Sequence, residues 1–79
     1  MRIVNVIELQ NGVVDNIESY VDIQPEEDTA KSDIVQQAED KFIELAVKHG
    51  CYDTEEALDN GKWTDGKYEV IIIWSNVNV

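Results

Sequence analysis

The residues best suited to chemistry form a short run, His49, Cys51 and Asp53, at the expected end of a helix. An imidazole, a thiol and a carboxylate at this spacing could ligate zinc or pair a nucleophile with a base. A zinc site needs three or four ligands, however, and the sequence holds one histidine and one cysteine. No residue that would orient the histidine and no glycine-rich loop for an oxyanion accompanies the run. We therefore expect a partly buried histidine and a small buried thiol, with no catalytic or metal site.

Further acids follow this run as far as Asp65, which raises the question of a calcium site. The known helix–loop–helix calcium site needs oxygen ligands at alternate positions, a glycine at position six and a glutamate at position twelve. The spacing of these acids does not meet that pattern. A solvated helix face is the expected role, and we expect no bound cofactor or metal ion.

The whole chain is strongly acidic, with 17 Asp and Glu against 6 Lys and Arg and a net charge of −11. Direct binding of nucleic acid is not expected, because it depends on Lys and Arg that neutralise phosphates. Residues 25–61 carry eleven of the acids against three lysines, so the acidity belongs to the middle of the chain. The candidate acidic interaction face consists of Glu26, Glu27, Asp28, Asp33, Glu39, Asp40, Glu44, Glu55, Glu56 and Asp59.

The elements that position these residues begin with two strands, residues 2–10 and 13–23, joined by Asn11-Gly12. Asn-Gly between β-rich runs is the strongest short hairpin signal, since both central residues of a type I′ turn need positive φ. Pro25 ends the second strand. The second strand has one polar row, which suggests an edge position. Its apolar row comprises Val13, Ile17, Val21 and Ile23.

A long helix should begin between residues 28 and 32 and end at His49, with Gly50 as the left-handed residue that follows. A second helix of about two turns is expected over residues 53–60, capped by Asp53 and ended by Gly61. Apolar residues of the long helix share one arc and should cover the sheet: Ile34, Val35, Ala38, Phe42, Leu45 and Ala46.

The last strand, residues 68–74, is apolar on both faces from Val70 to Trp74. The segment before it is expected to be a loop with Trp63 at the edge of the core, the alternative being a short strand. The sequence thus predicts a single α+β domain over residues 1–79. Its sheet is three-stranded, or four-stranded with the short strand, antiparallel or mixed, in the order 2-1-3. The main helix packs on one face.

One long helix and one short helix do not suffice to cover both faces of such a sheet. A contiguous apolar patch of several hundred Å² normally marks an interface. We expect the far face, represented by Val4, Val6, Ile71 and Ile73, to be buried against a second copy or another partner.

These observations favour a non-enzymatic protein-interaction module that docks its acidic face on a basic protein surface. Short acidic proteins that imitate DNA use the same electrostatics. The order of the expected elements resembles that of small phage and mobile-element proteins, but the chain shares no specific motif with them. The first alternative is a homo-oligomeric structural or accessory protein joined through the exposed sheet face, and the second is a small enzyme. One cysteine, no signal-peptide pattern and no apolar run of membrane-spanning length favour a cytoplasmic protein.

Overall fold

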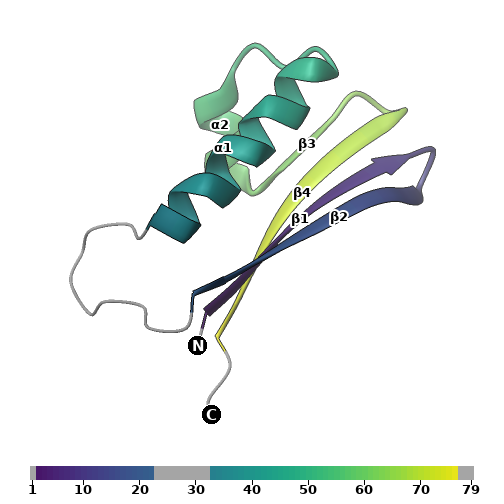
Figure 1. Ribbon diagram of the computed structural model, residues 1–79. Coiled ribbons are helices and arrows are strands. Elements are labelled where there is room, and N and C mark those ends of the chain that lie inside the picture. Colours follow the sequence, from purple (N-terminus) through teal and green to yellow (C-terminus); the bar gives the residue numbers. More distant parts are fainter. Residues whose placement is uncertain (1, 23–32, 77–79) are drawn as a thin grey trace.

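The computed structural model describes residues 2–22 and 33–76, which form a four-stranded sheet with two helices on one face (Figure 1). The strands are β1 (Arg2–Gln10), β2 (Val13–Asp22), β3 (Lys62–Thr64) and β4 (Tyr68–Asn76). The helices are α1 (Asp33–Lys48) and α2 (Thr54–Asn60). Neighbouring strands are antiparallel, in the order β2-β1-β4-β3. The α+β class is confirmed, and the expected order is corrected by a fourth strand at the edge.

The β1–β2 hairpin turns at Asn11-Gly12, as predicted, with φ angles of 53° and 80°. Positive φ at both positions matches the right-handed twist of the two strands that the turn joins. β2 lies at an edge of the sheet, which confirms the position expected from its polar row.

A bulge in β2 determines which of its valines lies on which face of the sheet. Glu8 lies opposite Asn16, whereas Leu9 lies opposite Val14, so one residue of β2 is left over between them. The extra residue moves all side chains on its far side to the opposite face. Val14, instead of Val13, therefore shares a face with Leu9, which corrects the apolar row read from the sequence.

Residues 62–64 form the edge strand β3, so the expectation of a loop is wrong. Trp63 pairs with Val70 and reaches the helix side of the sheet, where it packs against the core. The turn into β4 is held by the Asp65 carboxylate, which accepts the N–H groups of Tyr68 at 2.8 Å and Lys67 at 2.9 Å. Both bonds lower the pKa of Asp65 from its ordinary value, and the bond from Tyr68 contributes most.

The core lies between α1 and the sheet and uses the stripe predicted from the helical spacing, except that Ile34 is only half-buried. Phe42 is fully buried at its centre. Ala38 and Ala46 are equally buried, and their small side chains allow the helix to approach the strands closely. The buried apolar residues are Val4, Val6, Val35, Ala38, Phe42, Leu45, Ala46, Cys51, Ala57, Val70 and Ile72.

The second helix, α2, begins and ends as predicted. The Asp53 side chain caps it by accepting the Glu56 N–H at 3.2 Å. Gly61 ends it in the left-handed conformation, with φ of 71°, and donates its N–H to the carbonyls of Ala57 and Leu58. α2 lies on the same side of the sheet as α1 (Figure 1).

The pairing of β1 with β4 decides which side chains the helices cover. Val4 and Val6 are 0% and 1% exposed and belong to the core under α1. Ile71 and Ile73 alternate with the buried Val70 and Ile72, so they point to the other side. The expected sheet-face interface is therefore wrong in Val4 and Val6, because it combined residues from opposite faces.

We expect Phe42→Ala to lower the free energy of unfolding by about 3–5 kcal/mol, because it leaves a cavity at the centre of the core. The matched control is Val47→Ala, since Val47 is 52% exposed on the same helix. Its effect should stay within about 0.5 kcal/mol. Urea unfolding followed by circular dichroism measures both. Equal losses for the two variants would contradict the packing of α1 on the sheet.

Candidate functional site

No described element covers the side of the sheet opposite the helices (Figure 1). This side is largely apolar. On this side Ile17 is 53% exposed, Val14 50%, and Val21 and Ile73 44% each. The other apolar residues there are half-buried. We call the whole set the open face: Ile3, Ile7 and Leu9 of β1, Val14, Ile17 and Val21 of β2, and Ile71 and Ile73 of β4.

The centre of the open face is a row of three isoleucines across three strands. Ile7 of β1 lies directly opposite Ile17 of β2 on one side and Ile71 of β4 on the other. In the next row the Ser19 hydroxyl donates to Asn5 Oδ1 at 2.6 Å. Because this polar pair is already hydrogen-bonded, its removal from water costs less than that of two unpaired groups.

Charge is scarce on the open face. Lys62 of the edge strand β3 forms an ion pair with Glu69 of β4, with Nζ and Oε2 3.9 Å apart, and Glu69 lies opposite Leu9 of β1. Asp15 lies in the bulge of the edge strand β2. The other described acids belong to the helix side of the sheet, to the helices or to the turn at Asp65. This face is therefore suited to an apolar, uncharged contact.

The acidic face expected from the sequence is only partly present among the described residues. Glu39 is 6% exposed, which contradicts its assignment to a docking surface. Glu26, Glu27 and Asp28 lie outside the described residues. The exposed members are Asp33, Asp40 and Glu44 of α1, and Glu55, Glu56 and Asp59 of α2.

Lys41 offsets part of this negative charge where α1 meets β2. Its Nζ lies 3.7 Å from Glu18 Oε1 and 3.8 Å from Glu44 Oε1. Glu18 also accepts a hydrogen bond from the Tyr20 hydroxyl at 2.7 Å. Burial, and then this contact with Glu18, raise the pKa of Tyr20 to about 12. These groups attach β2 to α1.

His49 contacts the sheet and is not among the side chains that line the pocket beside Cys51. Its Nε2 contacts Glu8 Oε2, and its ring stacks on Tyr68 with ring centres 4.1 Å apart. Lys48 Nζ lies 3.7 Å from the same Glu8 oxygen. Glu8 is 5% exposed, so this buried carboxylate joins the end of α1 to β1. Glu8 was not predicted as part of the core, although the alternation of β1 places it on the same face as Val6.

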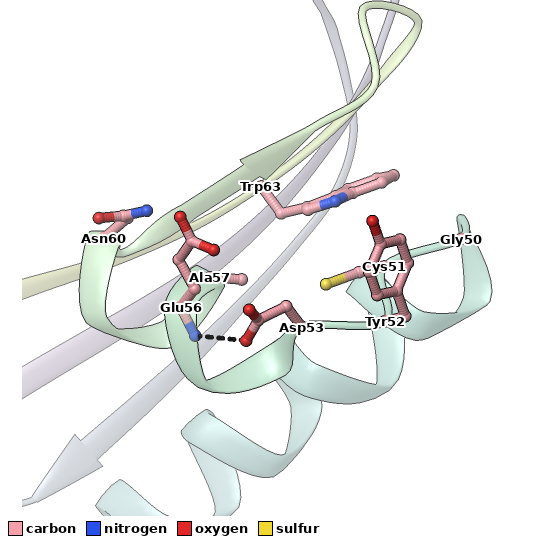
Figure 2. Close-up of a pocket in the computed structure, with 8 residues that line it drawn as sticks. All are labelled: Gly50, Cys51, Tyr52, Asp53, Glu56, Ala57, Asn60 and Trp63. Carbon is pink, nitrogen blue, oxygen red and sulfur yellow. Dashed lines mark hydrogen bonds between the residues drawn. The ribbon is translucent and has the colours of Figure 1, made fainter.

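A pocket of about 320 Å³ lies between the α1–α2 connection, α2 and β3 (Figure 2). The Cys51 thiol and the Trp63 indole border it, and Asp53 is another of its lining residues. Asp53 is engaged as the cap of α2. The residues that line the pocket are Gly50, Cys51, Tyr52, Asp53, Glu56, Ala57, Asn60 and Trp63.

The pocket pairs a thiol with carboxylates but places no basic side chain beside it. The thiolate that nucleophilic catalysis needs is favoured by a nearby positive charge, which this lining does not provide. Over residues 2–22 and 33–76, no three His, Cys, Asp or Glu side chains gather where they could hold a metal ion. The open face is therefore the stronger candidate for function.

Comparison with protein families finds no matching family model, and comparison with curated proteins and with solved structures finds no significant match. Neither described helix is long and apolar enough to cross a membrane.

We expect Glu8→Ala to lower the free energy of unfolding by about 1–3 kcal/mol, because His49 would lose its buried partner. Lys48→Ala is the control, since the Lys48 side chain is 63% exposed and contacts the same carboxylate. Its effect should be about 1 kcal/mol or less. Thermal and urea unfolding measure both. An effect of Lys48→Ala as large as that of Glu8→Ala would contradict the special role of the His49 contact.

Proposed function

We propose that the protein is a non-enzymatic interaction module that binds a protein surface through the open face. The observation that carries the proposal is the exposure of the apolar residues on a sheet whose helices all lie on the other side. Soluble monomers rarely leave contiguous apolar patches larger than a few hundred Å² in water, and the largest patch is often functional.

The size of the open face fits this function. β1, β2 and β4 contain 9, 10 and 9 residues. At about 3.3 Å per residue and about 4.8 Å between strands, they cover roughly 30 by 15 Å, or roughly 450 Å² in projection. Side chains that stand above the sheet expose more area than this projection, so the surface can support a specific contact.

A second candidate function is the docking of the acidic helical layer on a basic protein, as expected from the sequence. Asp33, Asp40 and Glu44 are exposed on α1 and would attract such a surface. Long-range attraction of this kind weakens as salt shortens the Debye length. The open face does not share this dependence, so the two candidates are separable.

We expect a photoreactive phenylalanine analogue at position 17 to cross-link to a protein under ultraviolet light, in cells that produce the chain. The analogue at position 47 is the control, because Val47 and Ile17 are 52% and 53% exposed on opposite sides of the molecule. Adducts resolved by mass spectrometry measure the outcome at each position.

Two results would count against the open face. Absence of adducts at both position 17 and position 73 would contradict an interaction there. Adducts at position 47 alone, formed with a basic protein and lost at high salt, would assign the function to the acidic helical layer.

A further inference from the structure

We infer that the partner on the open face is a second copy of this chain, with the two sheets stacked face to face. This inference rests on the interaction function proposed above and identifies the occupant of the same surface. Three properties of the face support it: the distribution of charge, the composition and the extent.

The charge distribution permits two copies to meet despite a net charge of −11 on each. The charged pair on the face, Lys62 and Glu69, is internally neutralised. The helices α1 and α2, which carry exposed acids, both lie on one side of the sheet, away from the open face (Figure 1). Stacked sheets lie about 10 Å apart and a helix is about 10 Å across, so the acidic layers of two copies would be separated by roughly 30 Å.

That separation exceeds the Debye length of about 8 Å at physiological salt more than threefold. Repulsion between the acidic layers of two copies is therefore largely screened. A strongly basic partner would gain little attraction from a face with so few charges. The open face of a second copy is a better match, because it is also apolar and nearly neutral.

The composition of the open face suits a dimer core. The row of Ile7, Ile17 and Ile71 crosses the sheet between the two ends of β1. It provides the apolar centre that is typical of well-packed interfaces. The adjacent Ser19 hydroxyl already donates to Asn5 Oδ1 at 2.6 Å. This bond lowers the cost of covering the two side chains, because a buried polar group without a hydrogen-bond partner is penalised in an apolar contact.

The extent of the face approaches what a stable dimer needs. A standard interface buries about 800 Å² of accessible surface on each partner. The open face covers roughly 450 Å² in projection, and its accessible surface is larger because the side chains stand above the sheet. Two twisted sheets pack face to face with their strands within about 30° of each other. A two-fold axis through the isoleucine row would bring the same side chains together from both copies.

Sedimentation equilibrium of the full chain over a range from low to high micromolar concentration tests the inference. We expect the mass to rise from one chain of 9.0 kDa towards two. Ile17→Lys should weaken the dimer roughly 100-fold or more, since it places a lysine charge without a partner in the apolar contact. Val47→Lys, at an equally exposed site on α1, should leave the dissociation constant unchanged.

Circular dichroism and thermal unfolding show whether each variant remains folded. Ile73→Lys is a second substitution on the open face and should weaken the dimer in the same way. A wild-type chain that stays monomeric at high micromolar concentration overturns the inference. So does equal weakening by Val47→Lys and Ile17→Lys. Cross-links from position 17 to a different protein, with a monomeric chain, would refute the second copy and leave the interaction function standing. Absence of both self-association and cross-links would refute both.

Discussion

The fold depends on one constraint: β1 carries apolar side chains on both faces, while the helices cover only one. Residues alternate along a strand, so Val4 and Val6 enter the core when Ile3 and Ile7 point away from it. An antiparallel sheet commonly solves this problem with a polar outer face. This sheet keeps isoleucines there, and the cost of leaving them in water is the reason for proposing a partner on this face.

The same constraint separates two kinds of surface. The helix side holds the core, the exposed acids of α1 and α2, and the buried contact between Glu8 and His49 that fixes the end of α1. The open face holds few charges and no described element packs on it. A protein with a strongly negative net charge can therefore associate through an apolar face without bringing its acids together.

Local signals made the hairpin, the stripe of α1 and both ends of α2 predictable from the sequence, because turns and caps depend on a few adjacent residues. The covered face was not predictable in this way. Ile3 and Ile7 are larger than Val4 and Val6 and by size alone would be assigned to the core. The close approach of α1 through its alanines instead favours the smaller valines, and the contact of Glu8 with the end of α1 is long-range. The choice between a loop and the short strand β3 could not be made from the sequence, because three residues are too few to show a period.

The central claim, that a second copy covers the open face, is tested most directly by isotope-filtered nuclear Overhauser measurements on a mixture of labelled and unlabelled chains. The account predicts intermolecular contacts at the methyl groups of Ile7, Ile17 and Ile71, and none at Val4 or Val6 beneath α1. Intermolecular contacts confined to the helical layer, or none at a concentration where the chain is fully associated in sedimentation, would contradict it.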